Sequence, residues 1–150
     1  MLAVCGFALS LASAAAFASE YQLRSLNVDS PYARATPPGA MTAGAFMKIA
    51  NRGNLPDRLV RAASPAAGGV ELHEMKMEGS VMRMRSVVGI EIGAGETVAL
   101  RPGGYHLMLV NLKHPLGEGE DVPLTLTFER AGSLDVVVKV EAMGAGAPTR

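Results

Sequence analysis

The chain contains no tryptophan, few aromatic residues and a single cysteine, Cys5, which lies near its N-terminus. The remainder therefore has no thiol, and it can form no internal disulfide and offers no thiolate to a metal. Fourteen basic residues balance fourteen acidic ones, so the net charge gives no reason to expect a nucleic acid or a charged membrane surface as partner. The scarcity of aromatic rings also argues against a surface on which nucleic acid bases stack.

The N-terminal segment has the composition of an export signal. Residues 1–18 are apolar and small, and they end in Ala16-Phe17-Ala18, which is typical of an h-region followed by an Ala-x-Ala cleavage site. This pattern predicts a signal peptide over 1–18, cleaved during export to the periplasm. No basic residue precedes Arg24, so either the signal is weak or the true start codon lies upstream.

Two membrane-attached alternatives are disfavoured. Cys5 loosely resembles a lipoprotein site, but it lies very early and follows Val4 rather than a small residue. A segment so rich in Ala and Ser is also a poor permanent membrane span. We therefore expect no stable membrane insertion of the mature chain.

The rest of the chain alternates between short strand-like runs and breaks rich in Gly and Pro. This punctuation predicts an all-β sandwich, and the absence of a repeat or linker predicts one domain over 19–150. The expected strands are Leu26–Ser30, Gly44–Ala50, Asp57–Ala63, Val70–Met77, Val81–Val87, Thr97–Leu100, Tyr105–Leu112, Pro123–Arg130 and Leu134–Glu141.

Four residues narrow the chemistry most: His73, Met84, His106 and Met108, with ten, twenty-one and one residues between them. Imidazole nitrogen together with thioether sulfur is a donor set that suits a soft ion of low charge, above all Cu(I). His106 and Met108 are two apart in an expected strand, so they share a face. These residues are the candidate metal ligands.

The other two candidates lie in an expected hairpin. If Glu78-Gly79 forms a two-residue turn, His73 is directly opposite Met84, and Met75 faces Met82 on the same side. On the other face Glu74 would then lie opposite Arg83, which is a favourable cross-strand charge pair. A turn at Gly79-Ser80 would instead place Lys76 opposite Arg83, and that like-charge pair disfavours the second register.

These residues carry a resemblance to a known family. The stretch from Ala43 to Val140 resembles the periplasmic copper chaperones of the PCuAC type, whose signature has the spacing of the four candidate ligands. The segments that carry the likeness are Glu71-Leu72-His73-Glu74-Met75, Pro102-Gly103-Gly104-Tyr105-His106-Leu107-Met108 and Val122-Pro123-Leu124-Thr125-Leu126-Thr127-Phe128.

The resemblance implies a cupredoxin-like or immunoglobulin-like Greek-key sandwich that binds one Cu(I) per chain through His73, Met84, His106 and Met108. It implies delivery of copper to an apo-acceptor, either the copper subunit of a cytochrome oxidase or a Sco-type thiol protein. Some members carry extra His and Met residues in the C-terminal tail. Residues 144–150 have neither, so a tail-borne second site is not expected.

Other functions compete with this interpretation. A blue-copper electron carrier needs a Cys thiolate, a zinc hydrolase needs harder ligands with an open position, and no nucleophile lies beside a base as covalent catalysis requires. We therefore expect no enzyme. Copper sequestration for tolerance and a structural or adhesion sandwich remain alternatives. Met75 and Met82 are interpreted as an apolar wall beside the metal.

Overall fold

The computed structural model describes residues 19–146, and within them the regular structure is entirely β-strand. No helix in this part of the chain is long and apolar enough to cross a membrane. The predicted signal peptide, residues 1–18, lies outside the described residues. The strands are β1 (Glu20–Leu23), β2 (Leu26–Arg34), β3 (Thr42–Asn51), β4 (Asp57–Ala63), β5 (Ala67–Glu78), β6 (Val81–Ser86), β7 (Ile90–Ile92), β8 (Thr97–Leu100), β9 (Tyr105–Leu112), β10 (Asp121–Phe128) and β11 (Gly132–Glu141).

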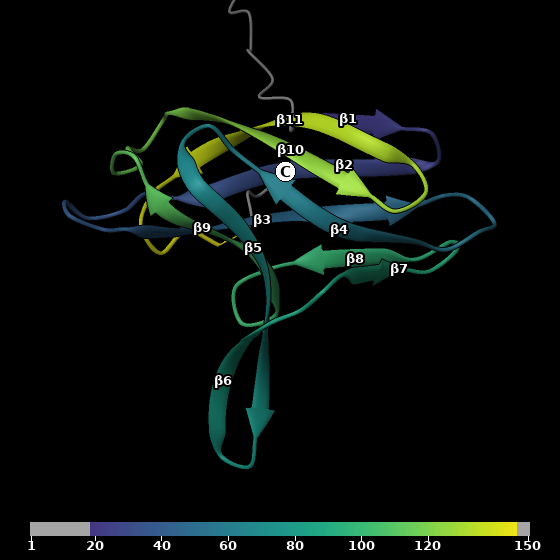
Figure 1. Cartoon of the computed structure of the whole chain (residues 1–150), viewed down its shortest axis with the longest axis horizontal. Helices are drawn as coiled ribbons and strands as arrows, with labels where there is room; N and C mark the ends of the chain where they lie inside the picture. The colour runs from purple at the N-terminus through teal and green to yellow at the C-terminus, as the bar shows by residue number, and fades with distance from the viewer. Residues whose placement is uncertain (1–18, 147–150) are drawn as a thin grey trace, which may run out of the picture.

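The strands close on themselves through hydrogen-bonded pairs. The order β2-β11-β10-β4-β5-β9-β3 is completed by pairing of β3 with β2. Most of these pairs are antiparallel, whereas β11 and β2 run parallel. The two long faces enclose the core, so the predicted all-β sandwich is confirmed (Figure 1).

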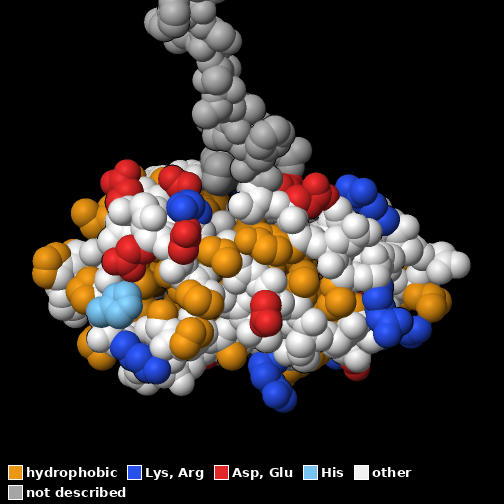
Figure 2. Space-filling view, turned by 90° about the horizontal axis from the view of Figure 1, so that it is seen from above, with side chains coloured by type: hydrophobic (Ala, Val, Ile, Leu, Met, Phe, Trp, Pro, Cys, Tyr) orange, Lys and Arg blue, Asp and Glu red, His pale blue; other side chains and the backbone are white. Residues whose placement is uncertain are grey.

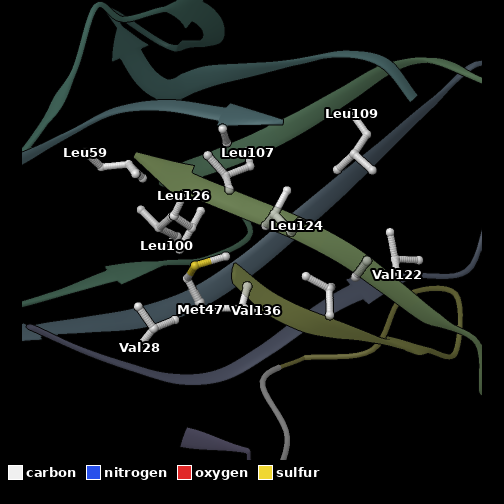
Figure 3. Packing of buried hydrophobic residues seen from close by; sticks show 14 of the residues in the cluster. Val28, Met47, Leu59, Leu100, Leu107, Leu109, Val122, Leu124, Leu126 and Val136 are labelled. Carbon is white, nitrogen blue, oxygen red and sulfur yellow. The ribbon is translucent and has the colours of Figure 1, made fainter. Parts of the chain in front are cut away.

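The core is built from inward-facing residues of the strands, and their alternation with outward-facing residues is clearest in β10. In β10, Val122, Leu124 and Leu126 point inward and are at most 3% exposed, while the residues between them are more exposed. Inward side chains from β2, β3, β4, β9 and β11 meet them in one cluster (Figure 3). Burial of apolar area is the main favourable term in folding, and here it holds together the strands that carry the candidate ligands.

The expected strands are largely present. Asp57–Ala63, Thr97–Leu100 and Tyr105–Leu112 have the predicted bounds, and the other six differ by one to four residues at one or both ends. Two short strands were not predicted, β1 and β7. β7 has only three residues, but Ile90 and Ile92 are fully buried where it pairs with β4, so tertiary packing makes it a strand.

A hairpin of β5 and β6 projects from the sandwich as an arm (Figure 1). The first part of β5 pairs with β9 inside the body, and its end pairs only with β6. Every residue of β6 is exposed. The arm therefore contributes little to the core, and packing does not determine which residues its sequence contains.

Charges of both signs occur across the face drawn in Figure 2, between apolar and neutral side chains. This agrees with the balanced composition. On this face the charge pattern gives no reason to expect attraction of a polyanion.

Candidate metal centre

His73 lies where the hairpin leaves the body. It pairs with Ser86 of β6 on one side and with His106 of β9 on the other. The two imidazole rings are 5.6 Å apart between centroids and meet edge to face, at 71°. Both side chains are buried, at 8% and 6% exposure. Strand pairing thus brings together two candidates that are thirty-three residues apart in the sequence.

The hydrogen bonds of His106 leave one ring nitrogen without a proton, so its lone pair can bind a metal. Nδ1 lies 3.1 Å from the carbonyl oxygen of Gly104, and a carbonyl can only accept, so Nδ1 carries the proton of the neutral ring. Nε2 then has a lone pair, and it lies 3.3 Å from Sδ of Met84. Two lone-pair donors face each other here, which is an arrangement that a cation completes.

His73 has the opposite tautomer, with the proton on Nε2 and the lone pair on Nδ1. Its Nε2 lies 2.7 Å from Oε2 of Glu71 and 3.3 Å from Oγ of Ser86. A carboxylate accepts, so Nε2 donates to Glu71 and Nδ1 is unprotonated in the neutral ring. That Nδ1 is buried and has no hydrogen-bond partner. A buried acceptor without a partner is costly in a folded protein, and a metal ion would satisfy it.

Met108 lies on the same outer face of β9 as His106, two residues further along. It pairs with Glu71 of β5 on one side and with Gly44 of β3 on the other, and its side chain is half-buried. The predicted sharing of a face by His106 and Met108 is therefore confirmed.

The predicted hairpin register is wrong. The turn is Gly79-Ser80, with Glu78 opposite Val81, so Met84 lies opposite Met75 rather than His73. The residue opposite Met82 is Met77, whereas the predicted register places Met75 there. Because the pairing shifts by two residues, the predicted side chains keep their common face.

Backbone geometry explains this register. Gly79 has φ of +65°, and tight two-residue hairpin turns require a positive φ at their first central position, which Gly adopts without strain. Lys76 does lie opposite Arg83. Exposed charges contribute little, however, and Arg83 pairs diagonally with Glu78 at 3.1 Å. The predicted Glu74–Arg83 pair is replaced by Glu74–Arg85, at 2.9 Å.

An aromatic wall closes one side of the site. The ring of Phe46 lies 6.4 Å from that of His106 and 5.2 Å from that of Tyr32, and the guanidinium of Arg34 lies 5.6 Å above it. A Cβ at position 44 would come within 2.9 Å of the ring. Gly44 therefore allows Phe46 to fold back over β3, next to the ligand face.

The apolar wall expected from Met75 and Met82 takes a different form. Met82 is 48% exposed and Met84 50%, because β6 has no core to cover. Met75 is half-buried. The residue that packs against His106 is Phe46, which the sequence did not single out.

Sequence reasoning also missed Glu71 and Ser86, which hold His73. Glu71 could have been found, because it precedes His73 by two residues on one strand and so shares its face. Ser86 could not, because its position depends on the turn.

The arrangement is suited to a soft monovalent ion. Two imidazoles and two thioethers are neutral donors, and thioether sulfur binds soft cations well and hard ones poorly. Each imidazole is oriented by a hydrogen bond from its other nitrogen, which is typical of metal-ligating histidines. The donor set, the partnerless Nδ1 of His73 and the open Nε2 of His106 therefore fit a copper(I)-like ion.

Comparison with known proteins agrees with the fold. The sequence model of the family described as "Putative lipoprotein LpqE-like" matches residues 26–140. A protein of Leifsonia xyli subsp. xyli, named "Putative lipoprotein Lxx21020", is 34% identical over 142 residues, which cover 94% of this chain and 84% of that protein.

Solved structures extend the likeness. The copper-bound PCuAC domain from PmoF2 superposes with a TM-score of 0.72 at 27% identity, covering 83% of this chain and 98% of the domain. The solution structure of CuI-DR1885 from Deinococcus radiodurans has a TM-score of 0.64 at 30% identity, with 81% and 80% of the two chains covered.

Proposed function

Since this chain belongs to the LpqE-like family and shares the fold of PCuAC domains, we propose that it is an exported Cu(I)-binding metallochaperone. The ligands are His73, Met84, His106 and Met108, and they bind one Cu(I) per chain. The observation that carries the proposal is the 3.3 Å approach of Nε2 of His106 to Sδ of Met84. Two structural relatives, the copper-bound PCuAC domain from PmoF2 and CuI-DR1885, support copper as the cargo.

Each ligand has a distinct role. Nδ1 of His73 and Nε2 of His106 supply the stronger σ-donors, and Glu71 and the Gly104 carbonyl hold the rings in the required tautomers. Met84 closes the site from the arm, and Met108 closes it from the body. Because Met84 is on the exposed arm, it is the ligand that an incoming acceptor reaches first.

The neutral donors explain why the protein would deliver copper rather than use it. Thioethers form no disulfides, so the site tolerates an oxidising compartment in which thiols are at risk. A thiolate acceptor binds Cu(I) with an anionic sulfur, and it can replace one neutral ligand at a time. Transfer to the copper subunit of a cytochrome oxidase, directly or through a Sco-type thiol protein, fits this chemistry. The chain acts as a carrier, not as an enzyme.

Export is part of the proposal. The LpqE-like family and the Leifsonia relative are both named as lipoproteins, which supports export of this chain. Cleavage after Ala18 would release a soluble periplasmic chain, whereas lipidation at Cys5 would anchor it. The intact mass of the mature chain purified from cells distinguishes the two, because only the second retains Cys5 and adds acyl groups.

The proposal is tested by competition with a Cu(I) chelator of known affinity, in parallel with Zn(II). We expect one tight Cu(I) equivalent and no comparable Zn(II) binding. No saturable Cu(I) binding would leave a structural or adhesion module. Incubation of the loaded chain with apo-acceptor then separates delivery from storage, because a sequestration protein keeps its copper in the presence of an acceptor.

A further inference from the structure

The hairpin arm has two chemically different faces. One face carries Met75, Met77, Met82 and Met84 as two directly opposed pairs, Met75 with Met84 and Met77 with Met82. The other face carries charged residues in ion pairs, Glu74 with Arg85 and Glu78 with Arg83.

Packing does not explain the methionines at the tip. Met77 is 55% exposed and Met82 48%, although apolar side chains of this size are commonly buried. Exposure of these side chains on a strand that covers no core brings no folding advantage. Their regular pairing on one face points to a role for the sulfur atoms themselves.

The geometry of the Met77–Met82 pair suits a soft ion. Directly opposed residues in an antiparallel pair have Cβ atoms about 4.5–5.5 Å apart, and methionine has three rotatable bonds. The two sulfur atoms can therefore converge on one cation, with Met75 as a neighbour on the same face. Thioethers are ligands that favour Cu(I) over harder ions.

We propose that Met77 and Met82, assisted by Met75, form a second, weaker Cu(I) site at the tip of the arm. It contains only thioethers, so it holds the ion less firmly than the site that includes two imidazoles. Met75 of the tip site lies directly opposite Met84, which is a ligand of the main site and reaches His106. Copper captured at the exposed tip would thus pass along one face of the hairpin to the buried site. This second role, as an entry path, rests on the function proposed above, whereas soft-metal binding at the tip does not.

The experiment is a titration of the mature chain with Ag(I), a redox-inert soft ion, followed by NMR of ¹³C-labelled methionine methyl groups. We expect the methyls of Met84 and Met108 to shift with the first equivalent and those of Met77 and Met82 with the second. Met41 and Met143 are internal controls, because they are 58% and 64% exposed and neither belongs to β5 or β6. Their methyls should remain unshifted through the second equivalent.

The double variant Met77→Leu/Met82→Leu should lose the second equivalent and keep the first. It should also load Cu(I) more slowly from a chelator complex while its final affinity for the first equivalent stays that of the wild type. Because both side chains are exposed, the fold should persist, and the unchanged shifts of core methyls would verify this.

The proposal is overturned if Met77 and Met82 do not respond, if they shift only together with Met41 and Met143, or if they shift with the first equivalent. The last result would make them ligands of the main site. Failure of the main site would be seen separately, as unchanged methyls of Met84 and Met108.

Discussion

His73 and His106 are direct cross-strand neighbours in the β5–β9 pair, with ring centroids 5.6 Å apart. This relationship is the centre of the site, because it brings two buried imidazoles onto one face at the base of the hairpin arm. Each ring uses one nitrogen in a hydrogen bond to an oxygen acceptor and keeps the other without a proton.

Replacement of Glu71 should weaken copper binding although Glu71 is not one of the four ligands. Its carboxylate accepts from Nε2 of His73 at 2.7 Å and so fixes the tautomer that presents Nδ1. Loss of such an outer partner typically lowers metal affinity about 10- to 100-fold. We expect Glu71→Ala to show a loss in this range and Glu71→Gln, which retains an acceptor oxygen, a smaller one.

Chelator competition measures both Glu71 variants. Glu74→Gln is the matched control, since Glu74 lies on the opposite face of the same strand and pairs with Arg85. Wild-type affinity in Glu71→Ala would show that the carboxylate does not orient His73.

Replacement of Met84 should lower Cu(I) affinity more than replacement of its cross-strand partner Met75. Met84→Leu removes the sulfur that lies 3.3 Å from His106, and it should lower affinity for the first Cu(I) at least as much as loss of an outer partner, about 10-fold or more. Met75→Leu should change this affinity much less. The same competition assay measures both variants. A larger loss of affinity in Met75→Leu than in Met84→Leu would make Met75 the ligand in place of Met84.

Gly44→Ala should damage the site through Phe46. The new Cβ would lie 2.9 Å from the ring, which is held between Tyr32 and His106 and has little room to move. Overpacking of this kind costs about 1–3 kcal/mol. Urea unfolding should show that loss in the apo-protein, and Cu(I) affinity should fall with it.

Gly69→Ala provides the control for the Gly44 variant, because its Cβ would meet Val110 at an ordinary 3.4 Å. If Gly44→Ala is as stable as Gly69→Ala and binds copper normally, Phe46 is not a fixed wall of the site.

Much of the fold and part of the candidate site can be predicted from the sequence, and the features that cannot be predicted have physical causes. The spacing of Gly and Pro predicted the strands, and alternation predicted the shared face of His106 and Met108. The predicted register of the hairpin is wrong because the backbone requirement of the turn at Gly79 outweighs the cost of an exposed like-charge pair.

The pairing of β5 with β9, and the position of Phe46 over Gly44, depend on contacts between segments distant in sequence. Local patterns carry no information on such contacts. The short strand β7 is missed for the same reason, because it pairs with β4, which is distant in sequence. Strand β1, by contrast, pairs with β2, which directly follows it in the chain.

Copper affinity should decrease in acid. Both imidazoles must be neutral to bind the metal, and a proton competes with the metal for the same lone pair. Binding should therefore be weaker at about pH 5 than at about pH 7.5, and the thioethers add no such dependence because they do not take up protons. The dissociation constant, measured at both values with a corrected competitor, checks this. Equal constants would remove both histidines from the ligand set.

The central claim is that one Cu(I) is bound by two imidazole nitrogens and two thioether sulfurs. X-ray absorption at the copper edge, recorded on the chain loaded with a single equivalent of Cu(I), tests it most directly. The account predicts a mixed inner shell of nitrogen and sulfur in equal numbers, with loss of one sulfur in Met84→Leu and of one nitrogen in His106→Ala. A shell of nitrogen and oxygen alone, or of sulfur alone, would contradict it.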